Sequence, residues 1–172
     1  MEIISEGIAV FEDVFLRNEE VIDLAEESRK WRAGTAGQTV DPEVRITDIH
    51  DLDPETELHS ELLETFIDCI TQYRLKYPAC IITSGEALRV GRYGKDGHYS
   101  IHSDSRGSER VLSGILYLND EYKGGELNFQ HQDITLKPKS GSLILFPSNY
   151  IYIHQSLPVL EGSKYIVLSW FK

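Results

Sequence analysis

The sequence predicts an α+β fold in which two N-terminal helices support a jelly-roll core of about eight strands. Apolar residues recur at helical spacing in two stretches before residue 84. Beyond it the chain changes to short alternating segments broken by glycine and polar turns, the pattern of an antiparallel sandwich or barrel. A length of 172 residues suits one domain. We expect a single domain over 1–172, with a helical support region and edge strands over 1–84 and the jelly roll that carries the site over 85–172.

The N-terminal region is expected to open with a strand and a helix. The segment Gly7–Phe15 contains alternating apolar residues and predicts the first strand. A helix is expected to begin at Asn18, because asparagine caps the free N–H groups of a helix start and the acidic Glu19 and Glu20 interact favourably with the helix dipole. Gly34 is expected to end this helix.

A loop, a short strand and a long helix are expected next. Glycines between Gly34 and Asp41 indicate a loop, which could be either a mobile lid or an ordinary connection. A strand is predicted over 44–49. Asp53-Pro54 is typical of a helix start, and an apolar face then continues to Lys76. The strands of the jelly roll are expected over 86–93, 99–103, 111–118, 126–130, 134–136, 142–146, 151–154 and 165–171.

Composition narrows the classes of function. The chain carries 28 acidic against 17 basic residues, a net charge of −11, which disfavours a protein that binds nucleic acid by neutralising phosphates. No apolar run approaches the length of a membrane span, and the N-terminus lacks a signal-peptide pattern, so a cytoplasmic protein of bacterial or viral origin is expected. Cys69 and Cys80 form no motif and are expected to be reduced thiols.

His102-Ser103-Asp104 is the candidate core of a metal site. Side chains alternate along a strand, so His102 and Asp104 are expected to point the same way. One further imidazole would complete the two-histidine, one-carboxylate triad of non-haem iron oxygenases, and His154 is the candidate, expected from the other sheet of the sandwich. By itself the triplet is more often part of a surface turn than of a metal site. His50, His59, His98 and His131 have no matching partner and are interpreted as non-ligands.

Lys164 is the candidate anion-binding residue. It shares a strand face with Ile166, Leu168 and Trp170, so if this face lines the interior a charge is placed where it is costly. Such a lysine needs an anionic partner, either a protein carboxylate or a small dicarboxylate bound at the metal. The hydroxyl group of Tyr93 or Tyr117 could serve the same anion, although for either tyrosine alone a core aromatic is the favoured interpretation.

Short motifs run in order through the second half of the chain. They are Arg92-Tyr93-Gly94, Gly97-His98-Tyr99, His102-Ser103-Asp104, Tyr117-Leu118-Asn119, Gly124-Gly125-Glu126-Leu127, Pro138 to Gly141, Phe146-Pro147 and His154 to Lys164, closing on Trp170-Phe171. From Glu86 to Phe171 the chain resembles the Fe(II)- and 2-oxoglutarate-dependent dioxygenases, and among them the prolyl 4-hydroxylases of the procollagen-proline type. The resemblance implies a double-stranded β-helix, the jelly roll of this family.

The resemblance also implies roles for the site residues. His102, Asp104 and His154 would bind Fe(II), Lys164 would pair with the far carboxylate of the cosubstrate 2-oxoglutarate, and Tyr93 or Tyr117 would hydrogen-bond to it. The reaction would consume O2, release succinate and CO2, and hydroxylate a C–H bond, with ascorbate as a reductant. Trp170 matches a position on the substrate side of the pocket, although a core tryptophan is an equally good interpretation. Arg106 could contact substrate, although a solvated loop arginine is the simpler interpretation.

The sequence therefore predicts a dioxygenase that hydroxylates a prolyl residue of a peptide or protein, and that acts on neither nucleic acid nor membranes. One alternative keeps the chemistry on another amino-acid side chain or a small molecule. A second is a non-catalytic metal-binding jelly roll, which Lys164 disfavours because a buried base with no anion to meet would only destabilise the fold. The sequence has no dimerisation heptad and predicts no oligomeric state.

Overall fold

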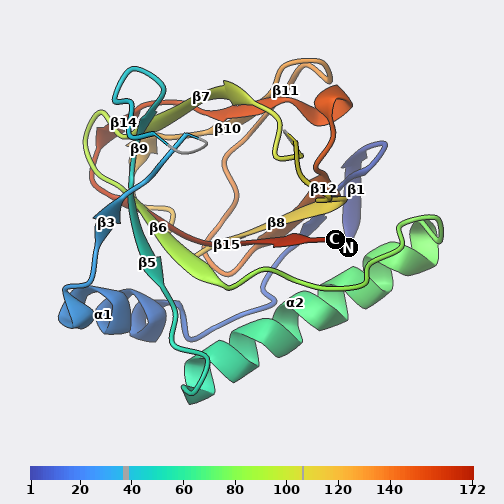
Figure 1. The fold of residues 1–172 in the computed structure, drawn as a ribbon, viewed down its shortest axis with the longest axis horizontal. Coiled ribbons are helices and arrows are strands. Elements are labelled where there is room, and N and C mark those ends of the chain that lie inside the picture. Colours follow the sequence, from blue (N-terminus) through green and yellow to red (C-terminus); the bar gives the residue numbers. More distant parts are fainter. Residues whose placement is uncertain (37–38, 106) are drawn as a thin grey trace.

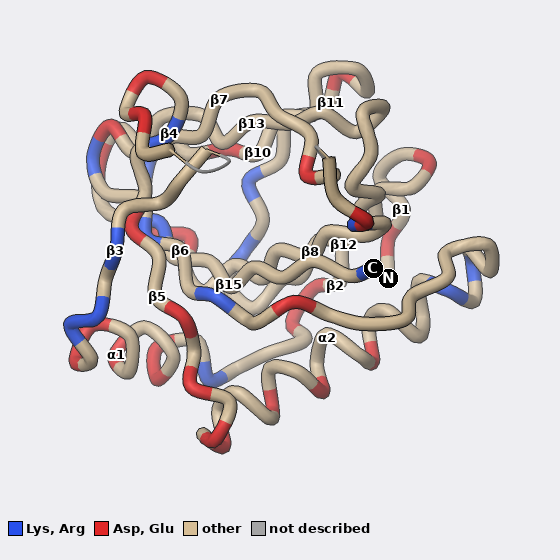
Figure 2. The backbone as a smooth tube through the Cα atoms, viewed as in Figure 1, with Lys and Arg blue, Asp and Glu red and all other residues tan. Residues whose placement is uncertain are grey.

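A computed structural model describes residues 1–36, 39–105 and 107–172. Two facing sheets enclose a central space, and the two helices, α1 (Asn18–Ser28) and α2 (Glu57–Lys76), lie along the outer face of the larger sheet (Figure 1). This arrangement confirms the predicted jelly roll with two supporting helices. Acidic residues follow both helices on the outside of the molecule (Figure 2).

Both sheets are built from antiparallel strand pairs. The larger has the order β1-β2-β12-β8-β15-β6-β5-β3, with bounds Glu2–Ser5, Ile8–Phe11, Leu143–Pro147, Leu112–Tyr117, Lys164–Phe171, Arg89–Tyr93, Asp48–Asp51 and Arg32–Ala33. The smaller has the order β11-β10-β13-β7-β4, with bounds Ile134–Leu136, Leu127–Phe129, His154–Ser156, His98–His102 and Arg45–Ile46. A separate pair joins β14 (Val159–Glu161) to β9 (Lys123–Gly124). The short strands β1, β9 and β14 were not expected from the sequence.

Helix α2 begins later than predicted. Asp53 accepts a hydrogen bond from Glu55 N at 3.0 Å and so forms a turn, whereas Thr56 caps the helix by accepting from His59 N at 3.2 Å. The helix therefore starts at Glu57, because a side-chain acceptor at Thr56 satisfies a free N–H group at this end. Its apolar face, with Leu62 and Phe66 fully buried, packs on the sheet as expected.

Helix α1 ends earlier than predicted, at Ser28. Arg29 has φ 53°, a left-handed conformation that ends the helix, and Arg32–Ala33 forms β3 instead of a last helical turn. Asn18 does not act as the cap: its Nδ2 donates to Phe15 O at 3.1 Å and the residue is itself helical. Here pairing of β3 with β5 prevails over helical periodicity.

The strand predicted over 44–49 is two strands in different sheets. β4 pairs with β7 in the smaller sheet, and β5 pairs with β6 in the larger one. Thr47 lies between them, and its Oγ1 donates to Arg92 O at 3.0 Å. The chain therefore crosses from one sheet to the other at this point and closes one side of the cavity.

The strand predicted over 151–154 is a 3-10 turn, Tyr150–Tyr152, followed by β13. Asn149 caps this turn by accepting from Ile151 N at 3.0 Å. Local capping thus prevails over the alternating apolar pattern. The sequence left open whether the loop from Gly34 to Asp41 is a lid or an ordinary connection. Residues 37 and 38 of this loop lie outside the described ranges. A β-bridge joins Ala36 to Thr39.

Two apolar cores hold the layers together. One lies between the helices and the larger sheet and includes Phe66 and Leu116, and the other lies between the two sheets and includes Phe129 and Phe146. Both cysteines are free thiols, as expected. Among the described residues, neither helix is long and apolar enough to cross a membrane.

Close approach of α2 to the sheet depends on Gly114 in β8. A Cβ atom there would lie 2.7 Å from Phe66 Cε1 and 3.1 Å from Leu145 Cδ2. We predict that Gly114→Ala lowers the free energy of unfolding by about 1–3 kcal/mol, because Phe66 must shift within a packed core. Urea denaturation measures the change. Gly94→Ala, where nothing lies within 4 Å of the added atom, is the control, and equal stability of the two variants would contradict the packing argument.

Candidate metal centre

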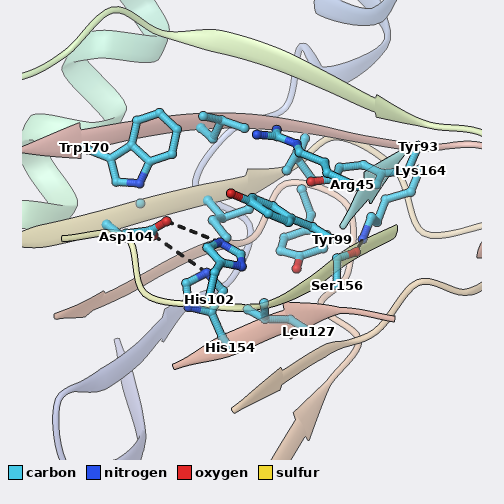
Figure 3. Close-up of a pocket in the computed structure, with 16 residues that line it drawn as sticks. Arg45, Tyr93, Tyr99, His102, Asp104, Leu127, His154, Ser156, Lys164 and Trp170 are labelled. Carbon is cyan, nitrogen blue, oxygen red and sulfur yellow. Dashed lines mark hydrogen bonds and ion pairs between the residues drawn. The ribbon is translucent and has the colours of Figure 1, made fainter. Parts of the chain in front are cut away.

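Three potential ligands converge at the edge of the cavity between the sheets. His102 is the last residue of β7, Asp104 lies in the turn after it, and His154 is the first residue of β13. His102 Nε2 lies 3.4 Å from Asp104 Oδ1 and His154 Nε2 lies 3.7 Å from Asp104 Oδ2. Ligand atoms of all three lie within 4.8 Å of one another (Figure 3). The structure thus brings the predicted triad together.

The position of His154 is set by strand pairing within one sheet and not by contact between the two sheets. β7 and β13 are antiparallel neighbours in the smaller sheet, and His154 lies directly opposite His102. The expectation that His154 comes from the other sheet was wrong. His102 and Asp104 do point toward the same place, as expected. The reason is not strand alternation, because β7 ends at His102 and a turn carries the carboxylate toward both imidazoles.

Both imidazoles are held with Nε2 available for a metal. His102 Nδ1 lies 2.8 Å from Ser100 O, and His154 Nδ1 lies 3.1 Å from Tyr152 O. A carbonyl oxygen only accepts, so each Nδ1 carries the proton and each Nε2 keeps its lone pair. Backbone carbonyls orient metal-binding histidines in this way in many proteins. The donor set and its outer partners therefore fit a divalent transition metal ion.

The Asp104 carboxylate stays ionised although it is buried. Burial would raise its pKa, but the two neighbouring imidazoles and the Ser113 hydroxyl outweigh burial and hold the pKa well below its usual range. Ser113 Oγ donates to Asp104 Oδ2 at 2.6 Å and also contacts Ser148 Oγ at 2.8 Å. Burial lowers the pKa of His154 to about 4, so this imidazole is neutral at pH 7 and can act as a ligand.

Lys164 lies inside the cavity, as predicted, and is only 2 % exposed. Its Nζ donates to Gly125 O at 2.8 Å and to Ser156 Oγ, and lies 4.3 Å from the centre of the Tyr93 ring. Within the described ranges no carboxylate forms an ion pair with it, and burial lowers its pKa to about 7. A buried cation held only by neutral groups favours an anionic ligand over a protein partner.

Both predicted tyrosines line the same cavity as Lys164. Tyr93 lies opposite Lys164 in the β6–β15 pairing, and Tyr117 lies opposite Ile166 in the β8–β15 pairing. Burial raises the pKa of Tyr117 well above its usual value, so its hydroxyl is protonated and can donate to an anion.

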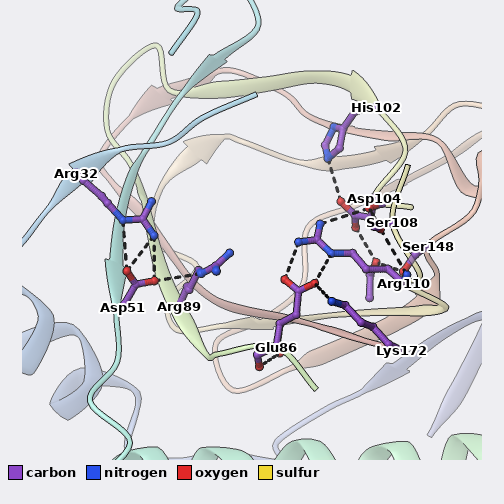
Figure 4. A network of polar contacts seen from close by, with 12 residues as sticks. Arg32, Asp51, Glu86, Arg89, His102, Asp104, Ser108, Arg110, Ser148 and Lys172 are labelled. Carbon is purple, nitrogen blue, oxygen red and sulfur yellow. Dashed lines mark hydrogen bonds and ion pairs between the residues drawn. The ribbon is translucent and has the colours of Figure 1, made fainter. Parts of the chain in front are cut away.

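Trp170 also lines the cavity, and Arg110 holds its ring. The Arg110 guanidinium lies 3.8 Å from the centre of the ring, donates to Glu86 Oε1 and Oε2 at 2.8 and 2.6 Å, and reaches Asp104 O at 3.3 Å (Figure 4). Arg106 lies outside the described residues. His50 packs against Trp31, with ring centroids 5.7 Å apart, and none of the four histidines interpreted as non-ligands joins a metal-binding group among the described residues.

Two residues of the site were missed as functional candidates, Tyr99 and Arg45. The Tyr99 ring stacks on His102 at 3.6 Å between centroids, and the Arg45 guanidinium lies 4.4 Å from the centre of the Tyr99 ring. Strand alternation would place Tyr99 and His102 on opposite faces. The β7–β13 register shifts so that three steps along β7 match two along β13, and this extra residue turns both rings toward the cavity. Composition and spacing carry no signal for such a shift.

Comparison with known proteins agrees with this geometry. The sequence model of the 2OG-Fe(II) oxygenase superfamily matches residues 88–172. A putative prolyl 4-hydroxylase of Acanthamoeba polyphaga mimivirus is 32% identical over 110 residues, covering 52% of this chain and 46% of the relative. Prolyl 4-hydroxylase subunit alpha-1 of Gallus gallus is 30% identical over 108 residues, covering 52% and 21%. The chain spans about half or less of the length of these relatives.

Solved structures share the fold across nearly the whole chain. The viral collagen prolyl hydroxylase of Paramecium Bursaria Chlorella virus-1, in a 2OG complex, superposes with a TM-score of 0.76 at 20% identity, covering 96% of this chain and 95% of the other. A Pseudomonas putida prolyl-4-hydroxylase gives 0.72 at 24% identity, covering 96% and 92%. At these identities the likeness establishes the jelly-roll fold.

We predict that Mn²⁺ at a hundredfold excess over its Kd raises the melting temperature by about 5–10 °C, because an ion bound by the folded state stabilises it. His154→Ala should remove most of this gain, since only His102 and Asp104 would remain as protein ligands. His59→Ala, on α2, is the control. Thermal unfolding with and without the ion measures both, and an unchanged gain in His154→Ala would contradict the site.

Proposed function

We propose that this chain, as a member of the 2OG-Fe(II) oxygenase superfamily whose sequence model matches residues 88–172, uses Fe(II), 2-oxoglutarate and O2 and hydroxylates a prolyl residue of a peptide or protein. The observation that carries the proposal is the pairing of two features in one cavity: a His102, Asp104 and His154 cluster, and a buried Lys164 without a carboxylate partner. One would hold the metal and the other the far end of a dicarboxylate.

The proposed metal ligands are the Nε2 atoms of His102 and His154 and one carboxylate oxygen of Asp104. When bound, Fe(II) supplies the activation of O2 that couples decarboxylation of 2-oxoglutarate to hydroxylation of a C–H bond. The protein's part is positional. Ser100 O and Tyr152 O fix the two rings, and Ser113 leaves Asp104 with one oxygen free of a hydroxyl donor.

Lys164 is the proposed partner of the far carboxylate of 2-oxoglutarate. A charged lysine and a carboxylate would compensate each other in the buried cavity, where each alone is costly. The Tyr117 hydroxyl, and that of Tyr93, are proposed as neutral donors to the same cosubstrate. The alternative partner for Lys164 is a protein carboxylate. Burial lowers the pKa of Lys164 and the nearby Glu126 carboxylate offsets part of this effect, but no described carboxylate forms an ion pair with the lysine.

A prolyl substrate is supported by the relatives and by the aromatic rings that line the metal-site cavity. The named relatives are prolyl 4-hydroxylases, and one similar structure is a Trichoplax adhaerens prolyl hydroxylase in complex with a hypoxia inducible factor peptide. Trp170, held by Arg110, and Tyr99 present apolar rings on the outer side of the triad. Arg106 as a substrate contact and ascorbate as a reductant belong to the same proposal. Another side chain or a small molecule is the alternative acceptor.

The proposal also assigns a division of labour along the chain. All four charged or metal-binding residues of the proposed mechanism, His102, Asp104, His154 and Lys164, come from the jelly-roll part, 85–172. The support region, 1–84, supplies both helices and strands of both sheets.

We predict a visible absorption band when Fe(II) and 2-oxoglutarate are added together without oxygen, because a 2-oxoacid chelated to Fe(II) absorbs in the visible. The band should require both additions, disappear in His102→Ala and persist in His59→Ala. With oxygen and a prolyl peptide, succinate should form in the native chain and be lost in His154→Ala. Full succinate production by His154→Ala would refute the proposed triad.

Lys164→Met should weaken cosubstrate binding without lowering the stability of the fold. We expect 2-oxoglutarate to bind about 10–100-fold more weakly, because a charged partner is lost, while Mn²⁺ binding is unchanged. The free energy of unfolding should stay within about 1 kcal/mol of the native value or rise, since a buried unpaired charge is removed. Titration calorimetry and urea denaturation measure the two effects, with the exposed Lys95→Met as control.

The pH dependence of this stability difference follows from the lowered pKa of Lys164, about 7. Between pH 7 and about 10 the unfolded chain holds a proton on this lysine that the folded chain has lost. As the pH increases over this window, the free energy of unfolding of the native chain should therefore rise relative to that of Lys164→Met. The variant should be most stable relative to the native chain below pH 7. A difference that is independent of pH would contradict burial of a titrating lysine.

A further inference from the structure

Arg45 carries a buried charge that the proposed mechanism does not use. The residue is 9% exposed, and its Nε is buried without a hydrogen-bond partner among the described atoms. Its Nη1 donates to Thr35 O at 3.0 Å, and the guanidinium lies over the Tyr99 ring. No described carboxylate forms an ion pair with it, and the residues outside the described ranges, a glycine, a glutamine and an arginine, carry no carboxylate.

This charge cannot be removed by deprotonation. A buried lysine can become neutral, as the lowered pKa of Lys164 indicates, but arginine stays protonated at any physiological pH. Among the described residues its buried Nε–H has no acceptor and its charge meets only a carbonyl oxygen and the face of the Tyr99 ring, which is costly. A ligand that brings an acceptor and a negative charge would satisfy both, and the planar guanidinium matches a carboxylate in geometry.

Arg45 lies between the metal-site cavity and a second, polar cavity. The second cavity is lined by Arg32, Arg45 and Arg89, and it shares Arg45, Leu168 and Trp170 with the first. Figure 3 draws Arg45 and Trp170 among the side chains around the metal site. Arg45 therefore borders both the metal-site cavity and the second cavity.

Positive charge is in excess in this second cavity. Asp51 lies between the other two arginines, 2.9 Å from Arg32 Nη2 and 3.1 Å from Arg89 Nε (Figure 4). Three guanidinium groups thus face one carboxylate, although the chain as a whole has a net charge of −11. A cleft that is positively charged on a negatively charged protein attracts negatively charged ligands to that place.

We propose that Arg45, assisted by Arg89 and Arg32, binds a carboxylate of the substrate beside the residue that is hydroxylated. Tyr99 links the two sites, because its ring contacts the Arg45 guanidinium on one hand and His102 on the other. The anion is therefore held close to the reacting carbon, as a side chain or terminus near the acceptor in sequence. This inference rests on the proposed function and narrows its substrate class to acidic prolyl peptides.

Peptide binding to the full chain, loaded anaerobically with Fe(II) and 2-oxoglutarate so that no turnover occurs, tests the inference. The probes are blocked alanine-based peptides with one proline and one Asp placed one to three residues to either side, and the same peptides with Asn. A third set is neutral in its side chains and ends in a free carboxylate. Titration calorimetry gives the Kd of each.

We expect at least one Asp peptide, or the peptide with a free carboxylate, to bind about tenfold or more tightly than its neutral counterpart. Tighter binding of an acidic peptide is informative, because the net negative charge of the protein would by itself weaken the binding of acidic ligands. A preference for Asp assigns the anion to a side chain, and a preference for the free terminus assigns it to an α-carboxylate. Equal affinity of all acidic and neutral peptides would overturn the inference.

Variants connect the preference to the arginines. Arg45→Gln should abolish it, whereas Arg74→Gln, which removes the same charge from the exposed face of α2, should leave it intact. Arg89→Gln, at the partly exposed rim, should reduce it severalfold and serves as the second variant if Arg45→Gln fails to fold. A preference that survives in both cavity variants would refute the assignment.

The two proposals fail in distinguishable ways. The visible band of Fe(II) with 2-oxoglutarate does not involve the peptide. A native chain that shows the band but no carboxylate preference would overturn only the acidic substrate, whereas a chain that prefers acidic peptides but shows no band would overturn only the proposed chemistry.

Discussion

The pairing of β7 with β13 is the constraint on which the site depends. Backbone hydrogen bonds between these strands set His102 opposite His154, and the turn after β7 brings Asp104 to both. A slip of one residue would turn one imidazole away from the carboxylate. The register shift within the same pairing orients Tyr99 onto His102 and, through Tyr99, positions Arg45. One strand pair thus organises the metal-binding cluster and its surroundings.

Three buried charged groups differ in how the protein compensates them. Asp104 accepts a hydrogen bond from the Ser113 hydroxyl and lies beside two imidazoles, and together these hold its pKa below the usual range before any ligand arrives. Lys164 has only neutral acceptors, and Arg45 has one carbonyl acceptor and a bare Nε. The protein accepts the cost of the two cations in the free state. Such incomplete compensation is typical of groups whose partners arrive with ligands.

Two apolar cores pack around the cavity that holds these buried charges. The core between helices and sheet involves neither the metal-binding cluster nor Lys164, and α2 packs closely on β8 at Gly114. The core between the sheets continues to the cavity wall through Phe129 and Phe146, whose rings contact His154. Packing therefore supports the imidazole from the apolar side, and the backbone carbonyl of Tyr152 orients it from the other.

The sequence by itself was sufficient to predict the jelly roll, both helices, the triad His102, Asp104 and His154, and the inward position of Lys164. These features follow from periodicity, turn residues and ligand chemistry, which are local properties of the chain. Boundaries were less accurate wherever a local cap or strand pairing prevailed, as at Thr56, Arg29 and Asn149. The tertiary structure alone decided that His154 neighbours His102 in one sheet, that 44–49 crosses between sheets, and that Tyr99 and Arg45 join the site. Each depends on which strands pair and in what register, and pairing between residues distant in sequence leaves no trace in the local pattern.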